Sequence, residues 1–396
     1  MHTPNQTEVR KNFEAAYQRK PERAFFACGR VELLGNHTDH QNGVVLTAAV
    51  DRYIVAETAI GQADAVTLVS NGFSDCHVSL GDVAPRKEER FTTQGLVRGA
   101  VAKLLPYAKS RTGVQLAVRS EVPSGSGLSS SAAFSVLLLT ALNAVWEAGR
   151  TPLQLAGLAR EAERDYFGKP CGWMDPSAIA LGGVRYLDFS EPVPKEEELP
   201  SCLSQMGLSM VVLDVGIPHA DMTAQYAAIV DELSCVSCFF GKQTLSEVEE
   251  AAFYRSLPAV RLSCGDRAVL RAMHVFSENR RVREAKEALI RGDREAFLER
   301  IRASGASSMR WLQNVEPTLG GTTQPLTVAL SVLERLLQNE GAVRIHGGGF
   351  GGTILCLTNE TRAETLLTEA KALLGADGMI LHPVSVGAGE LREEKA

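Results

Sequence analysis

The segment at residues 123–132, Pro-Ser-Gly-Ser-Gly-Leu-Ser-Ser-Ser-Ala, most constrains what this chain can fold into. Residues 114–118 before it alternate apolar and polar side chains, which predicts a half-buried strand, and an apolar helix is expected over 132–147. Gly125 and Gly127 allow positive φ and a close approach of the backbone to a ligand. Because the N–H groups at a helix start favour an anion, this strand–loop–helix unit predicts a phosphate site.

A simpler interpretation of the same loop is that one serine caps the helix after a glycine turn. Two glycines and three consecutive serines exceed what a cap requires, so phosphate binding is favoured. The serine hydroxyls could add hydrogen bonds or a metal ligand. The loop lacks Gly-Lys-Ser/Thr, which excludes a Walker A loop.

A second glycine cluster at residues 347–352 has the spacing G-x-G-x-x-G. A dinucleotide-binding fold requires a helix after this motif, but residues 353–357, Thr-Ile-Leu-Cys-Leu, predict a strand. We therefore reject a nicotinamide-dependent oxidoreductase. Two strands joined by this turn could press backbone against a ligand or could form a tight hairpin without one.

The remaining pattern mixes strands and helices without strict alternation, which predicts an α+β architecture in both halves. Three prolines and four glutamates at 191–200 predict a domain boundary, with domains at 1–195 and 196–396. A strand at 25–27 is expected to enter a turn at Gly29. Further strands are expected at 44–60, 184–187, 209–215 and 342–346, and helices at about 9–19, 152–167, 222–233, 266–291, 294–304 and 326–338.

Composition and charge exclude several classes of protein. The net charge of −6 argues against a nucleic-acid-binding surface over much of the chain. No run approaches the roughly 18 apolar residues of a membrane span, and the polar N-terminus lacks the apolar core of a secretion signal, so a cytoplasmic protein is expected. Cys235 and Cys238 form a C-x-x-C within a predicted helix, without a second pair at zinc-site spacing.

Charged residues gather at two places in apolar sequence. Arg30, His37 and Asp39 lie in one short segment, and Asp175 follows Cys-Gly-Trp-Met with Glu163 in the helix before it. Since buried charges need partners, an Arg30–Asp175 pair is expected, either as a structural ion pair or as part of a phosphoryl-transfer site. Such a site needs a phosphate cradle, a metal, a residue for the attacking hydroxyl and nearby positive charge.

Separated motifs resemble the galactokinase family, nearly from end to end. Residues 29–40, G-R-V-E-L-L-G-N-H-T-D-H, resemble the family's G-R-V-N-L-I-G-E-H-T-D-Y, and the 123–132 loop is similar to its P-x-G-x-G-L-S-S-S-A. Residues 341–352 resemble G-A-R-M-T-G-G-G-F-G-G, Glu163 with residues 171–175 resembles E…C-G-I-M-D, and 274–279 is similar to H-V-x-x-E-N.

The resemblance implies a two-domain fold of the galactokinase, homoserine, mevalonate and phosphomevalonate (GHMP) kinases, with the active site in the cleft between domains. It also implies ATP, Mg²⁺, phosphorylation of the C1 hydroxyl of galactose and a monomer or weak homodimer. Asp175 matches the catalytic aspartate, Arg30 the arginine that steadies it, and Ser131 and Glu163 the magnesium ligands. The phosphate-binding positions are Gly125, Ser126, Gly127, Leu128, Ser129, Ser130 and Ser131, and the sugar-contacting positions are Asn36, His37, Thr38, Asp39, Gly172 and Tyr226.

Departures from the family pattern leave the choice of substrate open. Asn36 replaces a glutamate that contacts the 6-hydroxyl in the family, His40 a tyrosine and Glu32 an asparagine. A neutral hydrogen bond is about half as strong as a charge-assisted one. A kinase for a sugar altered at C6 therefore stays an alternative. A non-catalytic sugar and ATP sensor is a second alternative, which the intact serine–alanine loop disfavours, and a mevalonate or homoserine kinase is a third, which His37 and Asp39 disfavour because they suit a polyol.

Overall fold

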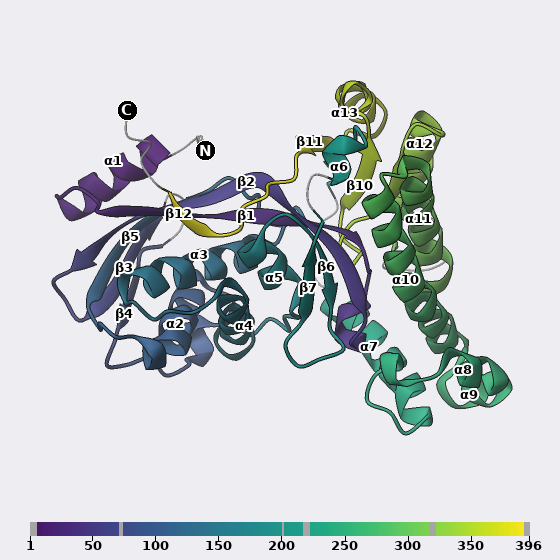
Figure 1. Cartoon of the computed structure of the whole chain (residues 1–396), viewed down its shortest axis with the longest axis horizontal. Coiled ribbons are helices and arrows are strands. Elements are labelled where there is room, and N and C mark those ends of the chain that lie inside the picture. Colours follow the sequence, from purple (N-terminus) through teal and green to yellow (C-terminus); the bar gives the residue numbers. More distant parts are fainter. Residues whose placement is uncertain (1–5, 71–73, 200–201, 217–221, 317–321, 392–396) are drawn as a thin grey trace.

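The computed structural model describes residues 6–70, 74–199, 202–216, 222–316 and 322–391. Within them the chain forms two sheets, one in each half of the molecule (Figure 1). In the first sheet β12, β1, β2, β5, β3 and β4 lie side by side, and β6 and β7 extend from β2. Its strands are β1 (Arg23–Leu34), β2 (Val44–Gly61), β3 (Ala65–Ser70), β4 (Cys76–Ser79), β5 (Gly113–Ser120), β6 (Val184–Asp188), β7 (Lys195–Glu198) and β12 (Gly389–Leu391).

Helices cover both faces of the first sheet (Figure 1). Successive side chains of a strand point to opposite faces, so Phe25 and Ala27 enter the large core beneath the sheet. Phe26 and Cys28 instead pack with Phe13 of α1 on the other face. The helices are α1 (Gln6–Tyr17) on one face, and α2 (Thr93–Leu104), α3 (Ser130–Val145), α4 (Pro152–Ala162) and α5 (Met174–Leu181) on the other.

The second sheet is antiparallel, in the order β11-β8-β10-β9. Helices α12 and α13 pack on it around Leu333 and Leu366. Ala285 of α10 and Phe297 of α11 join the core of the first half, so one apolar core runs through both halves. The elements are β8 (Ser209–Asp214), β9 (Ala342–Ile345), β10 (Thr353–Thr358), β11 (Asp377–Leu381), α10 (Asp266–Arg291), α11 (Arg294–Ser307), α12 (Pro325–Leu337) and α13 (Glu360–Leu374).

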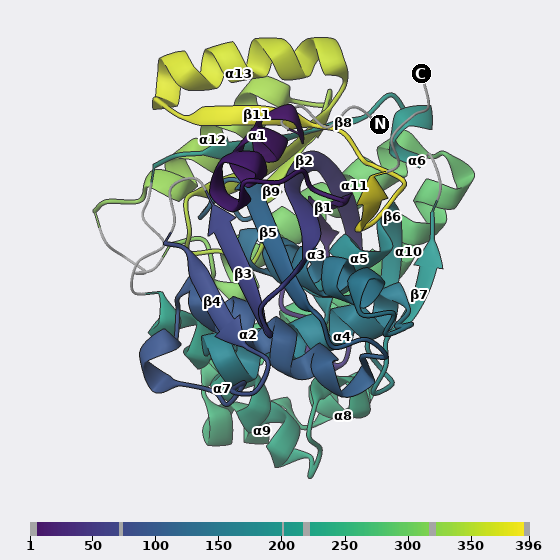
Figure 2. The same cartoon turned by 90° about the vertical axis from the view of Figure 1, so that its left-hand side faces the viewer.

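The second half extends from α13 at one end to α8 and α9 at the other (Figures 1 and 2). Its remaining helices are α6 (Cys202–Gln205), α7 (Thr223–Phe239), α8 (Glu250–Arg255) and α9 (Leu257–Cys264). Cys235 and Cys238 lie in α7 as predicted, and all eight cysteines, which fall within described segments, are free thiols. None of the described helices has the length and apolar character that crossing a membrane requires.

Two local predictions were wrong in detail. Gly29 does not turn the chain, because β1 continues to Leu34 and only its pairing register with β2 shifts between Cys28 and Gly29. The helix expected over 152–167 is α-helical only to Ala162 and continues as a π-helical turn over Glu163–Phe167. Such turns widen a helix and occur often at functional sites.

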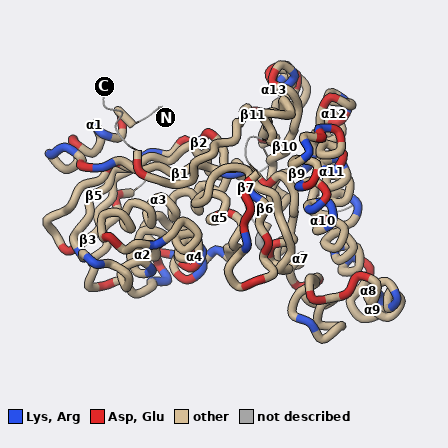
Figure 3. The backbone as a smooth tube through the Cα atoms, viewed as in Figure 1, with Lys and Arg blue, Asp and Glu red and all other residues tan. Residues whose placement is uncertain are grey.

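The predicted domain boundary at 195/196 falls at the first residue of β7, which pairs with β6 in the first sheet. Much later in the chain, β12 returns to the first sheet and pairs with β1. The boundary stays a prediction. Figure 3 shows acidic and basic residues interspersed along α10 and α11, where Arg300 and Glu284 form an ion pair.

Candidate active site

A cavity of about 190 Å³ lies where β1 meets the loop before α5 and the glycine turn between β9 and β10. Arg30 of β1 and Asp175 of α5 line it, together with His37 and Asp39. Gly348 closes it from the second half. The cavity therefore brings together residues from motifs more than 300 positions apart in the sequence.

The predicted Arg30–Asp175 ion pair is present. Arg30 Nε and Nη2 lie 2.9 Å and 2.8 Å from Asp175 Oδ1, and Ser129 Oγ donates to Oδ2 over 2.5 Å. A further Arg30 nitrogen, Nη1, donates to the Gly127 carbonyl. Burial raises the pKa of Asp175, but Arg30, Lys169 and the Ser129 hydroxyl together hold it below its usual value. Asp175 is therefore ionised, and it is tied directly to the glycine–serine loop.

The glycine–serine loop connects β5 to α3 and takes the backbone form that its glycines allow. Gly125 and Gly127 have φ of 79° and 73°. Ser129 stands at the helix N-cap with φ of 62°, but its side chain makes no capping bond and turns to Asp175 instead. The simple capping interpretation is therefore wrong for this serine. The Ser129 side chain therefore does not cap the first N–H groups of α3, which is compatible with the predicted anion site.

His37 and His40 form a hydrogen-bonded chain at the other end of the cavity. His37 Nε2 lies 2.9 Å from the Gly348 carbonyl, which can only accept, so this nitrogen carries the proton. His37 Nδ1 then accepts from His40 Nε2 over 3.1 Å, and His40 Nδ1 accepts from the Gln41 amide over 3.2 Å. Both rings are neutral in this arrangement. They join the 36–41 loop to the glycine turn of the second half.

Several predicted sugar-contacting groups are already engaged within the protein. Asn36 is fully buried, donates to the Gly347 carbonyl over 2.8 Å and accepts from Asn314 over 3.2 Å. The hydroxyl of Thr38 contacts backbone carbonyls of its own loop, and that of Tyr226 donates to the Gly349 carbonyl over 2.6 Å. These side chains hold the wall of the cavity. Their role as sugar contacts stays a prediction.

Three residues of α10 fix the same loop from behind. His274 Nε2 lies 3.1 Å from the Asn36 carbonyl, Glu278 Oε1 accepts from the backbone N–H of Gly35 over 3.1 Å, and Asn279 Oδ1 accepts from that of Val44 over 2.9 Å. The H-V-x-x-E-N motif therefore positions the loop. Sequence reasoning noticed the motif but assigned it no role, and it missed Asn314 entirely.

Comparisons with known proteins agree with this geometry. Residues 11–59 match the family model "Galactokinase galactose-binding signature", and 95–183 and 285–375 match the N-terminal and C-terminal domains of the GHMP kinases. A galactokinase of Actinobacillus pleuropneumoniae serotype 3 is 30% identical over 92% of this chain and 92% of its own length. The chain belongs to the galactokinase family. It is therefore an enzyme, a sugar kinase that uses ATP as a substrate.

Two further relatives of this galactokinase-family chain have similar coverage. A galactokinase of Streptomyces coelicolor is 28% identical over 94% of the chain and 93% of its own length. The crystal structure of Lactococcus lactis galactokinase complexed with galactose superposes with a TM-score of 0.84, at 23% identity, over 97% of this chain and 99% of that chain. The α+β GHMP-kinase fold predicted from the sequence is confirmed.

The predicted metal ligands also lie together in this galactokinase-family chain. Glu163 is fully buried, and neither of its carboxylate oxygens accepts a hydrogen bond within the described residues. Lys169 Nζ lies 3.5 Å from Glu163 Oε2 and 3.2 Å from Ser131 Oγ. A buried carboxylate without hydrogen bonds fits a ligand for a hard cation. No group of three or more His, Cys, Asp or Glu in the described segments is arranged to hold a metal.

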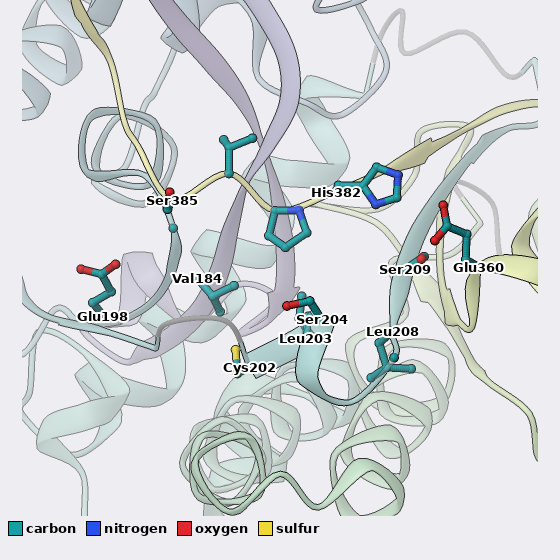
Figure 4. Close-up of a pocket in the computed structure, with 14 residues that line it drawn as sticks. Val184, Glu198, Cys202, Leu203, Ser204, Leu208, Ser209, Glu360, His382 and Ser385 are labelled. Carbon is teal, nitrogen blue, oxygen red and sulfur yellow. The ribbon is translucent and has the colours of Figure 1, made fainter. Parts of the chain in front are cut away.

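A larger cavity, about 590 Å³, lies elsewhere, between α6 and the segment that leads from β11 to β12 (Figure 4). Leu203 and Leu208 contribute apolar side chains, and Glu198, Glu360 and His382 contribute polar ones. None of the predicted site residues lines it. Its volume alone does not indicate a substrate site.

Acidification is expected to destabilise the fold. Burial lowers the pKa of His37, His40 and His274 from 6.5 to about 4. Between pH 6.5 and 4 the unfolded chain therefore binds protons that the folded chain does not, and the free energy of unfolding falls as the pH falls. Glu32 changes the free energy of unfolding in the opposite direction. Burial raises its pKa to about 7, although nearby arginines lower it.

Denaturant titration of the wild type and of His40→Gln at pH 7.5, 5.5 and 4.5 measures the contribution of His40 to this loss of stability. The loss of stability on acidification should be smaller in the variant than in the wild type. Equal losses in both proteins would show that His40 is not held neutral by the fold.

Proposed function

We propose that this enzyme phosphorylates the C1 hydroxyl of galactose with ATP, giving galactose 1-phosphate and ADP. The network Gly127–Arg30–Asp175–Ser129 carries the proposal, because it joins the phosphate loop to the cavity through one carboxylate. The galactose-binding signature at 11–59 and the galactokinases among its relatives support this sugar. They do not favour a sugar altered at C6 or a non-catalytic sensor.

In the proposed reaction, Asp175 accepts a hydrogen bond from the C1 hydroxyl of the sugar. This hydrogen bond orients the hydroxyl oxygen, O1, toward the γ-phosphorus. The new bond forms between O1 and that phosphorus, the bond to the β,γ-bridging oxygen breaks, and ADP leaves. A carboxylate of lowered pKa is a weak base, so Asp175 takes the proton only as the O–P bond forms. The N–H groups at the start of α3 and the residues 125–131 hold the triphosphate.

Glu163 and Ser131 would hold Mg²⁺, with phosphate oxygens and water as the remaining ligands. When bound, the ion neutralises charge on the β- and γ-phosphates. The fully buried carboxylate of Glu163, which accepts no hydrogen bond from the described residues, supports this assignment. The cytoplasm is the proposed location, and a monomer or weak homodimer the proposed assembly.

A sugar panel tests the proposal. The enzyme is incubated with ATP, Mg²⁺ and galactose, glucose, 6-deoxygalactose, galacturonate or mevalonate, and ADP release is followed while ³¹P and ¹³C NMR locate the phosphate. Galactose should give the highest kcat/KM and a phosphate on C1. A higher kcat/KM for a C6-altered sugar, or no ADP release with any substrate, would overturn the assignment.

Gly172→Ala tests the sugar end of the cavity. A Cβ at Gly172 would lie 2.4 Å from Asp39 Oδ2, so the carboxylate must move. If Asp39 contacts the sugar, KM for galactose should rise about tenfold or more, the effect of weakening one hydrogen bond to a charged group. KM for ATP should stay near the wild-type value. Steady-state kinetics in both substrates measures the two effects, and an unchanged KM for galactose would remove Asp39 from the sugar site.

A further inference from the structure

Lys169 follows the π-helical turn of Glu163–Phe167 and is held beside it by backbone geometry. Gly168 has φ of 89°, in the left-handed region, which reverses the chain. The backbone N–H groups of Gly168 and Lys169 both donate to the Glu163 carbonyl, over 2.8 Å and 3.1 Å. The turn therefore places Lys169 beside Glu163, the residue at which the turn begins.

The ammonium group of Lys169 lies between the phosphate loop and the cavity. Its Nζ is 3.2 Å from Ser131 Oγ, near the start of α3, and 3.5 Å from Glu163 Oε2. The side chain is 39% exposed and lines the same cavity as Asp175.

Contacts within the protein leave Lys169, like Arg30, an N–H donor for a ligand. Arg30 Nε and Nη2 contact Asp175 and Nη1 contacts the Gly127 carbonyl, so three of its five N–H donors are engaged within the protein. Lys169 has three N–H donors, of which one contacts Ser131 and one faces Glu163. Among the described residues that line this cavity, the arginine is Arg30 and the lysine is Lys169.

We propose that Lys169 is a further catalytic residue, whose ammonium group contacts the γ-phosphoryl oxygens of ATP during transfer. The inference rests on the proposed kinase reaction at this site. The lysine forms no covalent bond and keeps its proton. It donates hydrogen bonds to oxygens whose charge builds up as the bond to ADP breaks, and a preorganised donor at such a position accelerates the reaction.

A purely structural role is the competing explanation. Lys169 would then serve only as the counter-ion of the buried Glu163, and its removal would leave an unpaired carboxylate and a less stable protein. Stability, nucleotide affinity and kcat separate the two roles. Lys103 offers a matched control, because it pairs with Glu161 and Asp165 outside the cavity.

The experiment compares Lys169→Met, Lys169→Arg and Lys103→Met with the wild type. Lys169→Met should lower kcat for galactose at least about 10²-fold, as removal of one transition-state donor does, while KM for galactose changes little. Lys169→Arg should recover part of the rate, and Lys103→Met should keep the wild-type kcat. A Lys169→Met kcat within about threefold of the wild type would overturn the proposal, whatever its melting temperature.

A second measurement does not depend on turnover. Calorimetric titration with a non-hydrolysable ATP analogue, with and without Mg²⁺, should show an affinity at least about tenfold lower in Lys169→Met, a loss of 1.4 kcal/mol. If the wild type fails to phosphorylate galactose, the function proposed above fails, and this titration still decides the role of Lys169. Unchanged analogue affinity in that case would overturn it. If Lys169→Met does not fold, Lys169→Gln replaces it in both measurements.

Discussion

Asp175→Asn should lower kcat for galactose phosphorylation by about 10²–10⁴-fold, the range that a positioned acid–base group supplies. The amide keeps the size of the side chain and one acceptor oxygen for Arg30, but it cannot take the proton of the C1 hydroxyl. KM for ATP should change little, because the loop residues hold the triphosphate. Coupled measurement of ADP release, with circular dichroism to confirm the fold, checks the result.

Comparison with Asp175→Ala sharpens this test. Alanine removes both Arg30 contacts and the Ser129 bond, so it should be less stable than the asparagine variant while similarly inactive. Turnover by Asp175→Asn at more than a tenth of the wild-type rate would show that Asp175 is a structural ion-pair partner and no more.

Glu278→Gln should destabilise the protein by about 3–5 kcal/mol, the typical cost of breaking a buried ion pair. Glu278 is fully buried, lies 2.7 Å from Arg281 and accepts from Ser304 over 2.6 Å. Burial raises its pKa, but Arg281, His274 and Arg344 lower it to about 2. This stabilisation is complete above about pH 4.5 and is lost as the pH falls through about 2, so the variant should differ most from the wild type near neutral pH.

The matched control for this substitution is Glu284→Gln on the same helix. Glu284 pairs with Arg300 at the surface, and such pairs contribute about 1 kcal/mol or less. Urea denaturation at pH 7.5 gives both values. Because Glu278 also holds the N–H of Gly35, KM for galactose should rise in Glu278→Gln only. A loss of stability no larger than that of Glu284→Gln would contradict the assigned role of the α10 motif.

The local parts of the site could be predicted from sequence because local rules determine them. The loop at 123–132 is recognisable from glycine spacing between a strand and a helix. The Arg30–Asp175 pair follows from the cost of burying either charge alone. The register shift at Gly29 could not be predicted, because it depends on how β1 pairs with β2, far along the chain.

Other contacts depend on backbone conformations that non-glycine residues rarely adopt. His37 and Ser129 have φ of 60° and 62°, and these values direct the His37 ring to Gly348 and the Ser129 hydroxyl to Asp175. No spacing rule indicates such residues. Asn314 and Lys169 were missed for a related reason, since a single amide or a single lysine carries no pattern.

The return of β12 to β1 has a consequence for how the protein is made. Ala24 pairs with Leu391, so one side of β1 stays open while the ribosome synthesises more than 350 further residues. An open strand edge is a template for pairing with other chains. β1 also carries Arg30, and the glycine turn that closes the cavity is translated late as well. A nascent chain therefore lacks part of the cavity wall until Gly347 and Gly348 have been synthesised, and one edge of β1 lacks its β12 partner until Gly389–Leu391 has followed.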